Sequence, residues 1–99
     1  MKLKNLNGTE DNTCCCPSWL EHWKKFSEQQ IPEYCSEVKC MYKPTVGAHV
    51  QKNNDTDRNW YIVPLCNGHN RNAEYLEISN SVTLVPANVS ETCAKSKTK

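Results

Sequence analysis

A helical pattern of aromatic residues stands near the start of the chain. Trp19, Trp23 and Phe26 are spaced by four and three residues, so they fall on one face of a helix. Ser18 precedes this stretch and a glutamate follows three residues later, which is the capping-box pattern of a helix start. The pattern predicts an N-terminal amphipathic helix ending at an isoleucine-proline pair, with His22 as a partly exposed surface residue beside the aromatic stripe.

Strand-like segments follow in the second half of the chain. Trp60–Val63 is aromatic and β-branched throughout, which is the strongest strand signal in the chain, and Val46–Gln51 is a candidate short strand. A polar segment joins the two, which predicts a β-hairpin. A short helix is expected over Asn72–Leu76 and a last strand over Ser81–Pro86. Residues 33–45 have the composition of a tight loop.

The composition limits how much of the fold a hydrophobic core can support. The chain has 99 residues and is only 37% hydrophobic, so a covalent or metal staple is expected. Seven cysteines and three histidines supply the chemistry of such a staple. We predict a single stapled domain over residues 14–93, with flexible tails over 1–13 and 94–99. No apolar run reaches the roughly 18–20 residues of a membrane span, so no membrane partner is expected.

Two pairs of metal-ligand residues flank the predicted hairpin. Cys35 and Cys40 lie in the loop before it with four residues between them, and Cys66 and His69 follow it with two residues between them. Zinc prefers four thiolate and imidazole ligands in a tetrahedron. The sequence therefore predicts a zinc site that ties the loop to the following helix and contributes to folding. Buried free thiols or a disulfide are the alternatives.

The remaining cysteines leave a second zinc site open. Cys14 and Cys16 form a C-x-C pair that can reach one ion, and Cys93 near the other terminus is a third ligand candidate. His49 or, alternatively, His22 would be the fourth ligand. The alternatives are a disulfide between Cys93 and an N-terminal cysteine, or free thiols. We therefore predict one or two zinc ions per chain.

The expected compartment follows from the first residues and the cysteine count. Two lysines near the start are followed by no apolar signal region, so a reducing, cytoplasmic location is expected, where cysteines favour metal over disulfides. Seven cysteines also leave one unpaired in an all-disulfide scheme. Asn7, Asn54 and Asn88 begin glycosylation sequons, and they keep a secreted, disulfide-stapled protein as an alternative.

Residues 33–75 resemble a known group of zinc proteins. The loop cysteines, the segment Gly47-Ala48-His49-Val50 and the segment from Asn59 to Asn70 together resemble the HNH endonucleases, which are the ββα-metal members of the treble-clef zinc fingers. The resemblance implies an α+β treble-clef-like zinc domain made of a knuckle, a β-hairpin and a short helix. In that scaffold the two ligand pairs hold a structural zinc.

The same resemblance implies a catalytic set. His49 would be the base that activates water, Asn59 the residue that orients it, and Asn70 the last ligand of a catalytic Mg²⁺ or Mn²⁺ ion. The sequence departs from active members because Ala48 stands where an acidic ligand is usual and Asn70 where a histidine is usual. These departures favour a scaffold without nuclease activity.

The charge balance limits the partner. Twelve basic and eleven acidic residues give a net charge of +1, which excludes a strongly basic nucleic-acid binder and predicts weak nucleic-acid binding at most. We expect a small, monomeric, non-catalytic zinc-binding module whose partner is a protein or a nucleic acid. The alternatives are a metal-dependent HNH-type nuclease using His49 and the secreted, disulfide-stapled protein.

Overall fold

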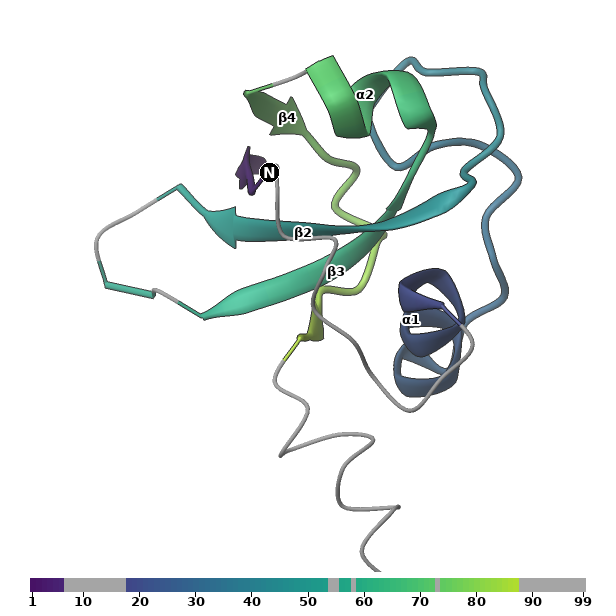
Figure 1. The fold of residues 1–99 in the computed structure, drawn as a ribbon, viewed down its shortest axis with the longest axis horizontal. Coiled ribbons are helices and arrows are strands. Elements are labelled where there is room, and N and C mark those ends of the chain that lie inside the picture. The colour runs from purple at the N-terminus through teal and green to yellow at the C-terminus, as the bar shows by residue number, and fades with distance from the viewer. Residues whose placement is uncertain (7–17, 54–55, 58, 73, 88–99) are drawn as a thin grey trace, which may run out of the picture.

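The described part of the chain is a small α+β fold built on an antiparallel sheet (Figure 1). The computed structural model describes residues 1–6, 18–53, 56–57, 59–72 and 74–87. Within these residues five strands pair in the order β4-β1-β2-β3-β5, and two helices accompany them. The elements are β1 (Lys2–Asn5), α1 (Trp19–Ser27), β2 (Val46–Lys52), β3 (Trp60–Leu65), α2 (Asn67–Asn72), β4 (Tyr75–Glu77) and β5 (Val85–Pro86).

The predicted hairpin is confirmed and forms the centre of the sheet. β2 and β3 pair from Val46 opposite Leu65 to Gln51 opposite Trp60. Their alternating side chains create two buried faces. We call the face that carries Val50, Leu65 and their neighbours the core face, and the face that carries His49, opposite Ile62, the helix face. In Figure 1, α1 and α2 lie on opposite sides of this hairpin.

The prediction of a flexible N-terminal tail is wrong for residues 2–5. These residues form β1, which pairs with β2 on one side and β4 on the other, so that Leu3 lies opposite both Lys52 and Leu76. Leu3 is 1% exposed, and burial of this side chain in the main core holds the strand in the sheet. Residues 7–13 and 94–99 lie outside the described residues.

The short helix and the last strand differ from the sequence prediction. The helix begins five residues earlier than expected, as α2, where the Asn70 N–H donates to the Cys66 carbonyl. Tyr75–Glu77 is the strand β4, because Leu76 is buried in the core while its two neighbours are exposed. The last strand is only Val85–Pro86, and a proline that cannot donate to a ladder suits this edge position.

Helix α1 starts at the predicted cap and packs on the helix face. The Glu21 N–H donates to Ser18 Oγ at 3.1 Å, and the helix ends at Ser27 because Glu28 adopts a left-handed backbone with φ of 60°. Trp23 is 1% exposed and joins a second hydrophobic cluster with Ile62 and Val85. Neither helix of the described chain is long and apolar enough to cross a bilayer.

His22 is buried, which corrects the prediction of a surface position. Its side chain is fully inaccessible, and Nε2 lies 3.0 Å from the carbonyl oxygen of Pro86. The ring also contacts Trp19 and Phe26 at centroid distances of 4.9 Å. Burial lowers the pKa of His22, although its hydrogen bond to the Pro86 backbone opposes this effect.

A close approach of α1 to β2 requires glycine at one position. A Cβ atom on Gly47 would lie 2.6 Å from the backbone nitrogen of Leu20, well inside van der Waals contact. The absence of a side chain therefore lets the first turn of α1 rest directly on β2. This contact places α1 over the same part of the sheet as His49.

Candidate metal centre

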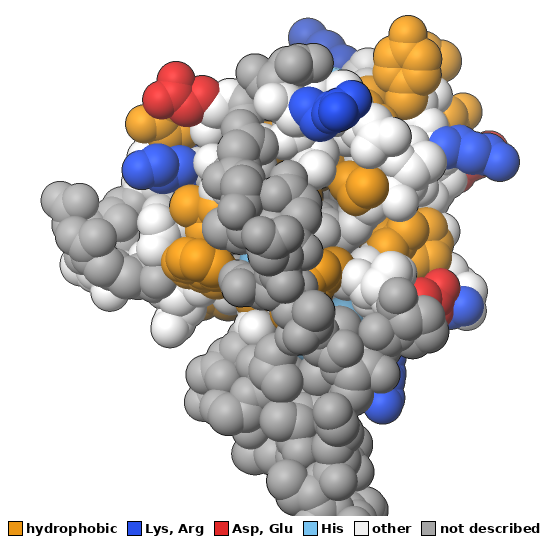
Figure 2. Space-filling view, in the orientation of Figure 1, with side chains coloured by type: hydrophobic (Ala, Val, Ile, Leu, Met, Phe, Trp, Pro, Cys, Tyr) orange, Lys and Arg blue, Asp and Glu red, His pale blue; other side chains and the backbone are white. Residues whose placement is uncertain are grey.

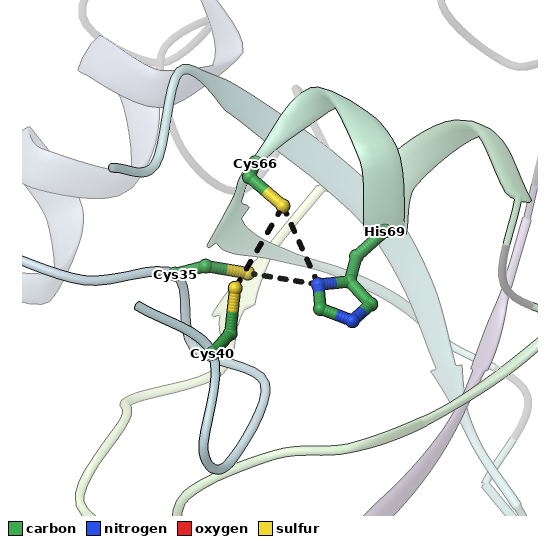
Figure 3. Close-up of side chains that lie close together, drawn as sticks. All are labelled: Cys35, Cys40, Cys66 and His69. Carbon is green, nitrogen blue, oxygen red and sulfur yellow. Dashed lines mark hydrogen bonds between the residues drawn. The ribbon is translucent and has the colours of Figure 1, made fainter. Parts of the chain in front are cut away.

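Four potential metal ligands converge where the hairpin meets α2 (Figure 3). Cys35 and Cys40 come from the loop between α1 and β2, Cys66 directly follows β3, and His69 lies in α2. Their ligand atoms, three Sγ and one imidazole nitrogen, all lie within 4.8 Å of one another. The structure therefore brings together all four residues that the sequence selects for the primary site.

The loop holds its two cysteines toward the same point through backbone hydrogen bonds. The Cys35 N–H donates to the Tyr42 carbonyl at 2.7 Å, and the Cys40 N–H donates to the Glu37 carbonyl at 3.1 Å. Lys39 takes a left-handed backbone with φ of 68°, which turns the chain just before the second cysteine. We call residues 35–40 the knuckle.

The distances fit a tetrahedral zinc site. Ideal tetrahedral coordination with Zn–S near 2.3 Å and Zn–N near 2.05 Å puts sulfur atoms about 3.8 Å apart and sulfur about 3.6 Å from nitrogen. Cys40 Sγ lies 3.9 Å from Cys66 Sγ, and His69 Nδ1 lies 3.6 Å from Cys35 Sγ and 3.3 Å from Cys66 Sγ. The cluster is thus geometrically compatible with zinc, with Nδ1 as the nitrogen nearest the thiols.

The pKa values of the two buried thiols, Cys35 and Cys66, are shifted in opposite directions. Burial raises the pKa of Cys35 to about 12, although hydrogen bonds from the backbone of Cys66 and Glu37 act to lower it. Burial also acts to raise the pKa of Cys66, but hydrogen bonds from the backbone and side chain of His69 and from the other two thiols bring it down to about 7. Of these two thiols, Cys66 is therefore the more ready to become a thiolate ligand.

The donor set describes a closed site. Cys35 and Cys66 are 5% and 7% exposed, and Cys40 and His69 are half-buried. A metal held by four protein side chains has no position left for water or substrate, which is the arrangement of structural rather than catalytic zinc. An ion bound here would join the knuckle to α2 across the end of β3.

Of the residues predicted for a second zinc site, the structure describes only His49. Cys14, Cys16 and Cys93 lie outside the described residues. His49 lies in the middle of β2, is 3% exposed, and packs edge-on against Trp19 with ring centroids 4.6 Å apart. The Cys3His cluster is the metal-ligand group found within the described residues.

The residues of the HNH-type catalytic set lie in two places. His49 and Asn70 line the same cavity, of about 200 Å³, between the start of α1 and β2. Asn59 precedes β3 at the hairpin turn, is exposed, and donates its N–H to Asp57 Oδ1 at 2.9 Å. The residue opposite His49 is Ile62, three positions beyond Asn59, which corresponds to about 10 Å along the strand.

Functional candidates at two places in the chain were missed by the sequence analysis. One is His22, whose burial depends on β5 and could not be inferred from the helical pattern alone. The other is Lys2 and Lys4 on β1, for which the alternation of lysine with Leu3 was the available signal.

Comparison with known proteins found no match to a family model, a curated protein or a solved structure.

Proposed function

We propose that this chain is a small zinc-binding module with a treble-clef-like, HNH-like scaffold that binds a macromolecular partner and catalyses no reaction. The Cys35, Cys40, Cys66 and His69 cluster carries this proposal, since its ligand atoms lie within 4.8 Å of one another. Three thiolates and one imidazole in tetrahedral reach are a donor set suited to zinc. The ion would stabilise a chain whose hydrophobic core is small.

The order of the elements supports the treble-clef assignment. The knuckle supplies two ligands, the β2–β3 hairpin follows, and the other two ligands stand at and within the start of α2. The proposed N-terminal amphipathic helix corresponds to α1, in which Trp23 is buried while Lys24 and Lys25 are exposed. We propose a reducing compartment, because Cys35, Cys40 and Cys66 form no disulfide. We also propose that the module is a monomer.

The surroundings of His49 support a module without catalysis. A general base must reach water and substrate, whereas His49 is 3% exposed and lies against the rings of Trp19 and Trp60. Ala48 cannot serve as an acidic metal ligand, and Asn59 lies apart at the hairpin turn.

Native mass spectrometry with metal analysis tests the proposal. We expect one zinc ion per chain, or two if Cys14, Cys16, Cys93 and His49 form the second site. A Cys66→Ser variant should lose the primary zinc. A protein with no zinc and a mass about six protons below the reduced value would contain three disulfides, and the secreted alternative would replace the proposal.

One observation keeps the nuclease as a second candidate. His49 and Asn70 line a common cavity, as an HNH-type site requires of these two positions. Plasmid DNA incubated with the protein and Mg²⁺ or Mn²⁺ tests it. Cleavage that disappears in His49→Ala would establish the nuclease, whereas intact plasmid supports the non-catalytic module.

A further inference from the structure

Part of the helix face carries exposed side chains. α1 packs against β2, β3 and β5 and buries Ile62 and Val85 beneath Trp23. Toward β1, β4 and the hairpin turn, the same face presents Tyr75 and Trp60, which are 45% and 39% exposed. Tyr and Trp are enriched where proteins contact partners, so these two exposed rings are candidates for such a contact.

The strand register aligns these rings in one row. Tyr75 lies opposite Lys4, Lys4 opposite Gln51, and Gln51 opposite Trp60. Residues directly opposite in antiparallel strands project to the same face, so these four side chains share it. We call them the stacking row. Its two rings are three strand spacings apart, about 15 Å, which is too far for one small planar ligand to touch both.

Positive charge accompanies the rings. Lys4 lies between them, and Lys2, two residues away on the same face, holds its Nζ 5.0 Å from the centroid of Tyr75. Glu77 is the acidic residue opposite Lys2, and its carboxylate lies 3.0 Å from the amino group of Met1. The charges of both lysines therefore remain available to an anionic partner.

We propose that the stacking row binds single-stranded nucleic acid, with one base on Tyr75, another on Trp60, and phosphates beside Lys2 and Lys4. Exposed aromatic rings interleaved with cations are the surface that such strands use, because every base has a face to stack and every linkage carries a charge. Lysine is depleted in protein–protein interfaces, whereas the phosphates of a strand require cations beside the rings, so Lys2 and Lys4 favour a nucleic acid over a protein partner. This inference rests on the proposed function, since it names the partner of that module.

The binding should be weak and tolerant of sequence. Figure 2 shows Lys and Arg side chains at separate places on the visible face, interspersed with hydrophobic and acidic ones. Two phosphate contacts predict that the logarithm of the association constant falls with the logarithm of salt concentration with a slope of about −1.4 for a single strand. Lys4→Ala should reduce this slope to about −0.7, because one contact is lost.

Fluorescence anisotropy with labelled dT12 and rU12 at low salt tests the inference on the zinc-loaded chain. Tyr75→Leu and Trp60→Leu should each weaken binding about tenfold, while Tyr75→Phe and Trp60→Phe should retain most of the affinity, because the ring is kept. The control is Tyr42→Leu in the loop beyond the knuckle, which removes an aromatic residue outside the row that is 75% exposed, more than either ring of the row. Stacking should also quench the fluorescence of Trp60.

The outcomes separate this inference from the proposed function because zinc content is measured on the same samples. A zinc-loaded protein that binds neither oligonucleotide overturns the inference and leaves the zinc module in place. A protein that takes up no zinc but still binds an oligonucleotide overturns the zinc module. Unchanged affinity in Tyr75→Leu and Trp60→Leu overturns the assignment of the surface. Equal binding of a duplex, or equal competition by poly-glutamate, shows that charge alone acts and also overturns it.

Discussion

Replacing Cys66 by serine should uncouple the stability of the protein from zinc. Cys66 connects the end of β3 to α2, and its Sγ lies 3.3 Å from His69 Nδ1 and 3.9 Å from Cys40 Sγ. A serine hydroxyl does not supply the thiolate that a tetrahedral zinc site requires. Because zinc binding in small zinc domains is worth about 10–16 kcal/mol, against a total stability of about 5–15 kcal/mol for a domain, the variant should be unfolded at room temperature.

The wild-type chain gives the magnitude of this dependence. Above the dissociation constant, each tenfold increase in free zinc adds about 1.4 kcal/mol to the free energy of unfolding. For a domain of this size, 1 kcal/mol moves the melting temperature by about 4–8 °C, so each tenfold step should raise it by about 6–11 °C. Circular dichroism melts at a series of buffered zinc concentrations measure this slope directly.

A variant with the same chemical change outside the cluster serves as the control. Cys15 belongs to neither predicted zinc site. Cys15→Ser therefore also replaces a thiol by a hydroxyl but leaves the four proposed ligands intact, so its melting temperature should follow zinc as the wild type does. A native-like NMR spectrum for Cys66→Ser, or a melting temperature of that variant that still rises with zinc, would show that Cys66 is not a ligand.

Three further predictions concern the pH dependence of zinc affinity, the pH dependence of stability through His22, and the close contact at Gly47. At pH 7 a Cys35 thiol with a pKa of about 12 is protonated and a Cys66 thiol with a pKa of about 7 is half ionised, so zinc releases at least about 1.5 protons. Competition titrations with a chelator should therefore show zinc affinity rising at least about 30-fold per pH unit near pH 7. Burial lowers the pKa of His22 below its usual value near 6.5, so the contribution of this residue to stability is complete above that pH and is lost as the pH falls through the lower pKa of the folded state. Urea unfolding should therefore give a smaller free energy of unfolding at pH 5 than at pH 7. This loss should be smaller in His22→Phe. Gly47→Ala should cost about 1–3 kcal/mol in urea unfolding, because its Cβ meets the backbone of α1, whereas Gly68→Ala, which meets nothing within 4 Å, should not destabilise the fold.

The hairpin and the ligand cluster could be predicted because their signals are local. β3 is apolar and β-branched at successive positions, and each ligand pair lies within a few residues of sequence, so spacing alone brings its two side chains to one point. Only the meeting of the two pairs needed tertiary structure. It followed from the hairpin, which returns the chain from the knuckle to the start of α2.

The elements that were wrong depend on distant partners. β1 is four residues long, and its place in the sheet comes from the burial of Leu3 against Leu76, which is 73 positions away in sequence. β4 is shorter still, and only its pairing with β1 distinguishes it from the helix that its residues suggest. His22 is buried by β5, so its position on the edge of a helical stripe could not reveal its environment.

The metal cluster and the stacking row meet at the outer edge of β4. The knuckle lies along that edge, where the Val38 N–H donates to the Glu77 carbonyl at 2.8 Å and Glu37 Oε2 accepts from the Glu77 N–H at 2.7 Å. Val38 and Glu37 stand between Cys35 and Cys40, two of the proposed zinc ligands, so an ion that held the knuckle would also hold β4. Trp60, by contrast, lies in the hairpin, which has its own ladder of hydrogen bonds. Zinc in the proposed module would therefore act on binding through one of the two rings, by fixing the strand that carries Tyr75.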